Sequence, residues 1–210
     1  MGGSCRRARV RRRGTSAASH LPDHVYALRA LNGVIAWTAP YGNADASPTI
    51  ADGRLFVEDA QTTQARPGRN AWNDVYALDA ERGRLLWSYE SGRGFLTRIG
   101  TSEEAIAGML HRAVLFQSLP AARRFAAFDA RTGRVLWSTR TDAAVKMSAI
   151  VFDRRVYVGD TAGVLYTLSE GDGRVLRRRR FGSFFTCSSP VIVGKTLYVA
   201  ANESVLALSP

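Results

Sequence analysis

The sequence predicts an all-β fold, a β-propeller built from four-stranded antiparallel blades. Three observations lead to this prediction. Glycines recur at Gly33, Gly83, Gly133 and Gly173, with spacings of 50, 50 and 40 residues. Short apolar runs alternate with turn-forming residues, and no long helical pattern interrupts them. Units of about forty residues with four short strands each are typical of propeller blades.

The clearest unit covers residues 148–182. It has β-rich runs at residues 149–152, 155–159, 164–168 and 174–181, and the segments between them are rich in Asp and Gly. Such segments are typical of the turns between antiparallel neighbours. We call the four strands of one unit A to D, in chain order.

The same pattern extends along the chain. Strands A and B are expected within residues 47–57 and 189–199, and in both segments a proline stands just before strand A, where a missing backbone donor is tolerated. The chain enters on a C strand at residues 24–30, passes through D and three full blades, and ends on A, B and a further C strand. A closed ring of four four-stranded blades has no place for this last strand, because residues 205–208 and 25–28 would compete for one position. The sequence therefore predicts about four blades in an open arc.

A motif of small, acidic, glycine and tryptophan residues marks the C and D strands. Ala-x-Asp-x-x-x-Gly-x-x-x-Trp occurs twice in full and once with Arg29 in place of the acid. It resembles the tryptophan-docking motif of the bacterial pyrroloquinoline quinone (PQQ)-like repeat family, over residues 25–210. The motif residues are Ala27, Gly33 and Trp37; Ala77, Asp79, Gly83 and Trp87; and Ala127, Asp129, Gly133 and Trp137.

The resemblance implies a structural role for the motif. The small Ala lets the next blade approach, Gly permits a tight turn, and Trp offers a flat apolar surface to the adjoining blade. One copy in every blade cannot face a single ligand, so the motif is interpreted as scaffold rather than cofactor site. Propellers of the family, which include quinoprotein dehydrogenases and an outer-membrane assembly lipoprotein, commonly have seven or eight blades. The resemblance thus implies an incomplete arc of a seven- or eight-bladed ring.

The third blade departs from the motif. Arg177 stands at the tryptophan position and begins a run of four arginines that ends at Arg180. Alternation along a strand would point Arg177 and Arg179 to one side and Arg178 and Arg180 to the other. The residues favour a charged edge strand that resists pairing with other chains, and a site for an anionic ligand is the less favoured alternative.

Two insertions interrupt the repeat around the first blade. One lies in the B to C loop, within residues 58–74, and the other follows strand D, within residues 91–104. In an antiparallel blade both connections fall on the same face. Arginine and aromatic residues are enriched in protein interfaces, so this face predicts a protein partner. The candidate partner face consists of Arg66, Arg69, Asn70, Trp72, Arg93 and Phe95.

The sequence favours a non-catalytic protein-interaction scaffold without a cofactor. His20, His24 and His111 have no metal-ligand spacing, and no catalytic, cofactor-binding or metal-binding residue is predicted. In the family, quinoprotein dehydrogenases need PQQ, calcium and usually a disulfide between adjacent cysteines, whereas Cys5 and Cys187 are far apart. A fragment of a PQQ- and calcium-dependent quinoprotein dehydrogenase stays open as the alternative.

The charge of the chain is concentrated in two segments. Ten arginines, six in the first twenty residues and four in the run from Arg177 to Arg180, account for most of the formal net charge of +11. We therefore expect no nucleic-acid partner, because such a surface needs its charges spread over one face. Residues 1–22 are expected to form a disordered basic tail, and residues 23–210 the PQQ-like propeller repeats.

Compartment and assembly follow less directly from the sequence. No apolar export segment follows the basic tail, and no stretch is long enough to span a membrane. Because the family often works outside the cytoplasm, the localisation stays open. An open arc leaves blade edges without neighbours, which predicts self-association through them.

Overall fold

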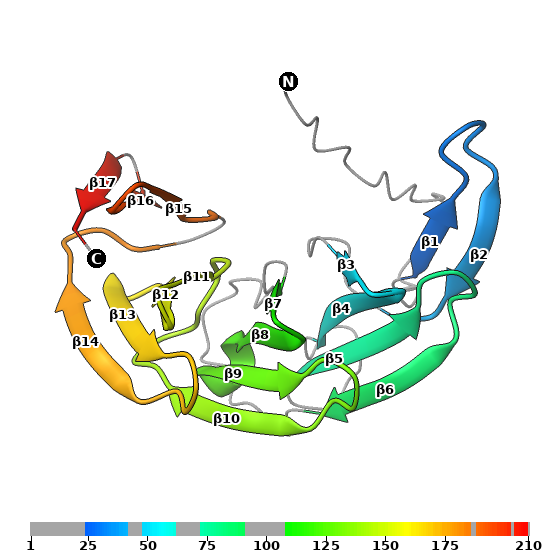
Figure 1. The fold of residues 1–210 in the computed structure, drawn as a ribbon, viewed down its shortest axis with the longest axis horizontal. Helices are drawn as coiled ribbons and strands as arrows, with labels where there is room; N and C mark the ends of the chain where they lie inside the picture. The colour runs from blue at the N-terminus through cyan, green and yellow to red at the C-terminus, as the bar shows by residue number, and fades with distance from the viewer. Residues whose placement is uncertain are drawn as a thin grey trace, which may run out of the picture.

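The computed structural model of the chain describes residues 24–41, 48–61, 72–90, 108–185, 188–202 and 204–209. These residues form seventeen strands in five antiparallel sheets, of two, four, four, four and three strands. The sheets follow one another along an open arc from β1–β2 to β15–β17 (Figure 1). No hydrogen-bonded pairing among the described strands closes this arc. The structure confirms the predicted all-β fold, an incomplete propeller.

Each sheet is one blade of consecutive strands. The entry blade consists of β1 (Val25–Leu28) and β2 (Ile35–Ala39), and the first full blade of β3 (Thr49–Ala51), β4 (Arg54–Gln61), β5 (Trp72–Asp79) and β6 (Leu85–Glu90). The second blade has β7 (Met109–His111), β8 (Val114–Leu119), β9 (Arg124–Asp129) and β10 (Val135–Arg140), with the short 3₁₀ helix η1 (Pro120–Ala122) between β8 and β9. The third has β11 (Ile150–Phe152), β12 (Arg155–Gly159), β13 (Val164–Ser169) and β14 (Val175–Arg180), and the last has β15 (Val191–Val193), β16 (Thr196–Ala201) and β17 (Ser204–Leu208).

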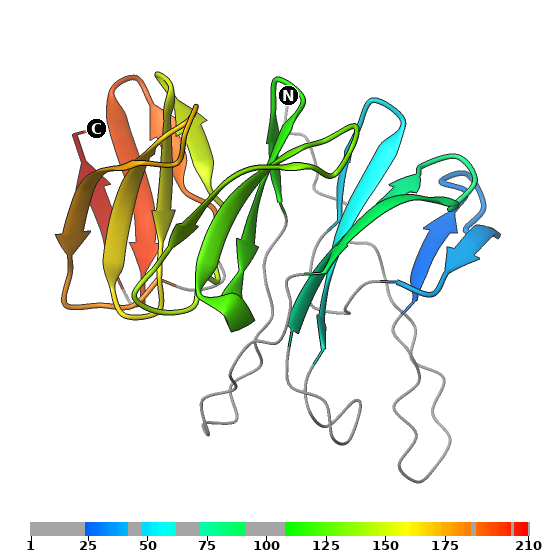
Figure 2. The same cartoon turned by 90° about the horizontal axis from the view of Figure 1, so that it is seen from below.

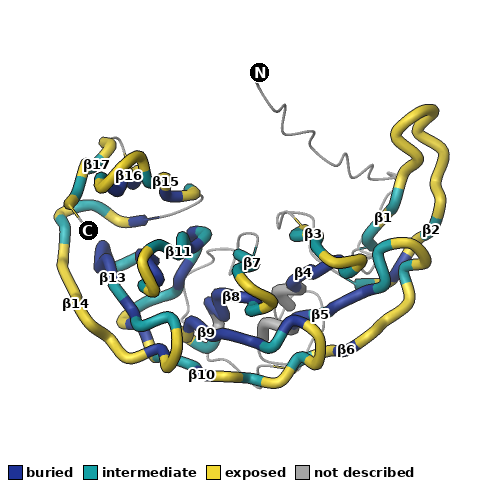
Figure 3. Tube along the Cα trace, viewed as in Figure 1, coloured by how far each residue is buried: buried dark blue, intermediate teal, exposed yellow. Residues whose placement is uncertain are grey.

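Within a full blade the A strand lies on the inner side of the arc and the D strand on the outer side (Figure 1). The view turned by 90° shows the twisted blades side by side (Figure 2). Burial follows this arrangement, because B and C strands are packed between neighbouring blades whereas β14 is exposed along its whole length (Figure 3). The apolar core therefore lies in the junctions between blades rather than in one central layer.

The turns explain why these residues form tight meanders. In the three full blades the A to B connections place both central residues at positive φ, at Asp52–Gly53, Arg112–Ala113 and Asp153–Arg154. Mirror-image two-residue turns of this kind match the right-handed twist of the strands that they join. In every full blade and in the entry blade, the register between C and D shifts by one residue, a β-bulge just before the motif tryptophan or its replacement.

The first blade differs in detail from the expectation. The B to C loop was expected within residues 58–74, but β4 continues to Gln61 and β5 begins at Trp72, because the paired backbones extend the hairpin. Residues 1–23 and 91–107 lie outside the described part, so the predicted tail and the whole of the second insertion are not tested. Among the described residues no helix has the length and apolar character to cross a membrane.

The two ends of the arc expose apolar side chains. Ile35 of the entry blade is 55% exposed, and Val193 and Val205 of the last blade are 63% and 70% exposed. Exposed apolar surface of this kind is consistent with the predicted self-association, which stays a prediction.

Candidate functional site

The motif tryptophans join each blade to the next one along the chain. The indole Nε1 of Trp37 donates a hydrogen bond to the carbonyl of Ala80 at 3.2 Å, and Trp87 donates to Ala130 at 3.0 Å. Trp137 donates to the carbonyl of Glu170 at 2.9 Å. Each acceptor lies in the C to D turn of the following blade. The junction is therefore directional, from strand D of one blade to the turn of its successor.

The motif glycines are the surfaces on which these indoles lie. A β-carbon on Gly133 would lie 2.6 Å from Cδ2 of Trp87, and one on Gly83 would lie 2.5 Å from Cε3 of Trp37. Gly173 receives Trp137 in the same way. These glycines also have positive φ, near +70°, which other residues rarely adopt. Gly33 has the same φ but no atom close to its would-be β-carbon, so at that position only the turn needs glycine.

The motif alanines and acids have local roles. Ala77 and Ala127 are fully buried and lie opposite Trp87 and Trp137 in the C to D register. Asp129 accepts hydrogen bonds from the backbone N–H groups of Arg131 and Thr132, and Asp79 accepts the equivalent pair in its own turn. The hydroxyl of Thr132 also donates to Asp129, and this is the main cause that lowers the pKa of that carboxyl. These acids close turns.

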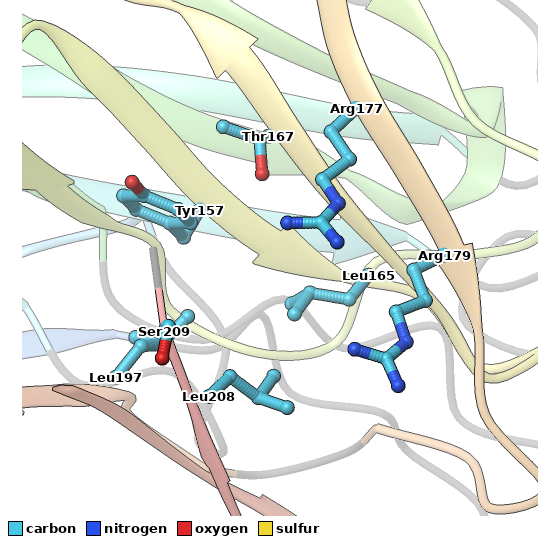
Figure 4. A pocket seen from close by; sticks show the side chains of 8 residues that line it. All are labelled: Tyr157, Leu165, Thr167, Arg177, Arg179, Leu197, Leu208 and Ser209. Carbon is cyan, nitrogen blue, oxygen red and sulfur yellow. The ribbon is translucent and has the colours of Figure 1, made fainter.

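The third blade breaks this pattern at a junction. In its C to D register Thr167 lies opposite Arg177, where Ala127 lies opposite Trp137 in the second blade. No indole fills the space in front of the last blade, and a cavity of about 30 Å³ is found there. It is lined by Tyr157, Leu165, Thr167, Arg177, Arg179, Leu197, Leu208 and Ser209. Figure 4 shows both guanidinium groups extending from β14 toward the same space.

The other two arginines of β14 point elsewhere. Arg178 and Arg180 both pair with Asp142, and Arg180 also donates to the carbonyl of Ala162 at 2.9 Å. This agrees with the alternation expected along the strand. Asp142 thus neutralises part of the charge on one side of β14, and it leaves Arg177 and Arg179 on the other side.

A second, larger cavity lies between the second and third blades, on the side of the A to B and C to D turns. Its volume is about 350 Å³, and its lining includes Arg112, Asp153 and Arg154. His111 and Glu170 face each other across the junction, with Nε2 and Oε1 3.5 Å apart. Glu170 stands where the first two full blades have Ala80 and Ala130. A comparison of the repeats in the sequence would therefore have identified Glu170 as a departure from the pattern.

The most deeply buried acid is committed to the fold. Asp160 is fully buried and accepts hydrogen bonds from the backbone N–H groups of Ala143, Ala162 and Val164 and from the hydroxyl of Tyr166. Burial, followed by this bond to Asp160, raises the pKa of Tyr166 strongly. Because donors already occupy the oxygens of Asp160, the carboxylate does not fit a calcium ion.

The other described acids do not form a calcium site either. Among the described residues there is no group of three or more His, Cys, Asp or Glu residues that could hold a metal ion. The acids that recur through the repeat, Asp79 and Asp129, accept hydrogen bonds from their own turns.

The structure describes little of the candidate partner face. Arg66, Arg69, Asn70, Arg93 and Phe95 lie outside the described residues. Trp72 is described through its backbone alone, as the first residue of β5, opposite Gln61.

Comparisons with known proteins agree with this architecture. A family model described as outer membrane protein assembly factor BamB matches residues 7–144 and 121–210. The chain is 28% identical over 192 residues to a tetrathionate hydrolase of Acidithiobacillus ferrooxidans, and the matched region covers 87% of this chain and 38% of the relative. It is 31% identical over 158 residues to BamB of Pseudomonas aeruginosa, covering 75% of this chain and 37% of the relative. The chain thus spans less than two fifths of the length of these two relatives.

Solved structures show the same fold. The structure of BamB from Moraxella catarrhalis matches with a TM-score of 0.56 and 21% identity, over 84% of this chain and 50% of the other. Quinohemoprotein alcohol dehydrogenase from Comamonas testosteroni matches with a TM-score of 0.58 and 16% identity, over 76% and 29%. Since the family model covers most of the sequence and the docked tryptophans recur in register, the chain belongs to the PQQ-like β-propeller repeat family of the outer membrane protein assembly factor BamB.

Proposed function

We propose that the chain is a non-catalytic propeller scaffold that binds a protein partner through the face carrying its two insertions. The observation that carries this proposal is that the described strand ends flanking both insertions lie together. Asp59, Asp74 and Glu90 are neighbours in the register of β4, β5 and β6. The two insertions therefore start from the same end of the strands of the first blade.

The second insertion also returns to that side. The first described residue after it is Gly108, whose carbonyl accepts a hydrogen bond from the hydroxyl of Thr49 at the start of β3. Thr49 lies opposite Phe56, toward the end of β3 that is remote from the A to B turn. This contact supports a continuous surface over the first and second blades, to which Arg66, Arg69, Asn70, Trp72, Arg93 and Phe95 would contribute.

The family supports the same function. A relative and the family model are described as an outer membrane protein assembly factor, a name that indicates work on other proteins. We infer that this chain also acts through protein contacts and needs no cofactor. Arginine and aromatic side chains are the residue types that most often dominate the energy of such interfaces.

The test compares variants of the tagged full chain in capture experiments from host extract, measured by quantitative mass spectrometry. The face variant carries Arg66→Ser, Arg69→Ser, Arg93→Ser and Phe95→Ala. The control removes three arginines and one apolar side chain from the turns on the opposite side, as Arg82→Ser, Arg131→Ser, Arg154→Ser and Leu31→Ala.

Some proteins should be captured equally by the wild type and the control variant. We expect the captured amount of these proteins to fall about tenfold or more with the face variant, because loss of interface anchors weakens binding by this amount. Equal capture by all three proteins would refute the proposed face, provided that their circular dichroism spectra agree.

An enzyme is the second candidate, and the tetrathionate hydrolase relative is the observation that favours it. The assay incubates the purified chain with tetrathionate and follows its loss by ion chromatography. Turnover that survives extensive purification would replace the scaffold proposal. The quinoprotein alternative is supported by likeness of fold alone. Its assay is a titration with PQQ and calcium, in which binding is monitored by the quenching of tryptophan fluorescence.

A further inference from the structure

The junction between the third and last blades has the composition of a binding site rather than of a blade seam. We propose that Arg177 and Arg179 bind one oxyanion group, a carboxylate, sulfonate or phosphate, at the mouth of the cavity between these blades. The proposal concerns a different part of the arc from the partner face, and it does not depend on the proposed function.

The strand register places both guanidinium groups on the same side. Arg177 lies opposite Thr167 and Arg179 opposite Leu165, so the two arginines are alternate residues of β14. In the second blade the equivalent positions hold Trp137 and Thr139, which donate to the carbonyls of Glu170 and Gly173 of the next blade. The third blade therefore replaces a seam of one indole and one hydroxyl by two cations.

No acid among the described residues that line the cavity balances the charges on this side of β14. Arg178 and Arg180 share Asp142, whereas the described residues that line the cavity include no acid. Arg179 lies with its guanidinium carbon 4.9 Å from the ring centre of Phe181, a contact that orients the group without neutralising it. Two neighbouring cations without an acid favour an anion between them.

The remaining lining residues suit a small polar group. Thr167 and Ser209 carry hydroxyls at the cavity, and the hydroxyl of Tyr157 is buried without a hydrogen-bond partner among the described residues. Leu165 and Leu208 provide apolar walls. A guanidinium presents its donors in a planar fork that matches an oxyanion. A volume of about 30 Å³ is about that of one water molecule, so the cavity has room for one oxygen of the anion, and the rest of the ligand would lie outside it.

The test is a titration of the ¹⁵N-labelled full chain, with the arginine ¹H–¹⁵Nε signals as the readout. Sodium sulfate and sodium phosphate probe free inorganic anions, and an acetylated, amidated peptide of four glutamates probes carboxylates carried by a protein. Sodium chloride is adjusted so that the ionic strength stays constant in every arm. We expect saturable shifts of the Arg177 and Arg179 signals with at least one probe, and the arm that binds more tightly identifies the source of the anion.

Matched variants separate binding from a general effect of charge. Arg177→Gln with Arg179→Gln should weaken binding by about tenfold or more, because it removes the charge-assisted hydrogen bonds. Arg178→Gln with Arg180→Gln removes the same charge from the same strand and should keep the affinity. Arg177→Trp restores the family residue, so it should fill the cavity and abolish the shift of Arg179 in a folded protein.

Three results would overturn the proposal. One is a linear shift that never saturates with any probe, as expected for an exposed edge strand. Another is equal weakening by the two double variants. The third is an unchanged anion response in Arg177→Trp, which would mean that the cavity is not the binding site.

Discussion

Substituting Gly133 by Ala tests the directional junction between blades. The new β-carbon would lie 2.6 Å from Trp87, so the indole must move away from its place over the turn. Alanine at positive φ costs about 1 kcal/mol by itself. Displacing the indole adds about 1 kcal/mol for its hydrogen bond to Ala130 and about 1 kcal/mol or more for overpacking. The free energy of unfolding should therefore fall by about 3 kcal/mol.

Gly33→Ala is the matched control. Gly33 occupies the same motif position with φ of +73°, against +74° at Gly133, but no atom lies within 4 Å of its would-be β-carbon. It should cost about 1 kcal/mol, the backbone term alone. The difference of about 2 kcal/mol would move the midpoint of urea unfolding by about 1 M, for a typical dependence on urea of about 2 kcal/mol per molar.

A second comparison isolates the indole. In a Trp87→Leu background the clash partner is gone, so adding Gly133→Ala should again cost about 1 kcal/mol. Equal losses for Gly133→Ala and Gly33→Ala in the wild-type background would refute the reasoning, because the close approach of Trp87 would then have no energetic consequence.

Two further predictions concern single side chains. Trp137→Phe keeps an aromatic ring in the junction but loses the hydrogen bond to Glu170, so urea unfolding should show a loss of about 1 kcal/mol, and an unchanged midpoint would contradict it. Tyr166 has a raised pKa in the folded state because of burial and its bond to Asp160, so its contribution to stability is complete below pH 10 and declines as the pH rises further. Tyr166→Phe should therefore lose less stability than the wild type between pH 8 and pH 11, and a steeper loss in the variant would contradict this.

The fold was accessible from the sequence because its signal is repeated. Turn residues, alternating strands and a motif at regular spacing all indicate the same meander, and the structure has the expected seventeen strands among its described residues. The lengths of β4 and β5 were less accessible, because polar residues such as Glu58 and Asn73 look like loop residues until their pairing partners are known.

Contacts between distant residues could not be predicted from the sequence. Asp142 lies in a connecting segment, 36 residues from Arg178, and no local pattern indicates that it pairs with two arginines of β14. The bond between Tyr166 and Asp160 likewise depends on how the connection around residues 160–163 folds back. In contrast, Thr167 and Arg177 stand out in the sequence because both break the motif at positions that are partners in the strand register.

The junction geometry explains which positions of the repeat are free to change. Each indole bonds to a backbone carbonyl, at Ala80, Ala130 or Glu170, so the side chain of the acceptor residue does not enter the bond. Glu170 could therefore replace alanine and face His111 without disturbing the seam. The glycine and the tryptophan have no such freedom, because each is in contact with the other across the junction. New chemistry in this scaffold should thus arise at acceptor positions and in loops, and a seam that loses its tryptophan, as at Arg177, must be stabilised by something other than apolar contact.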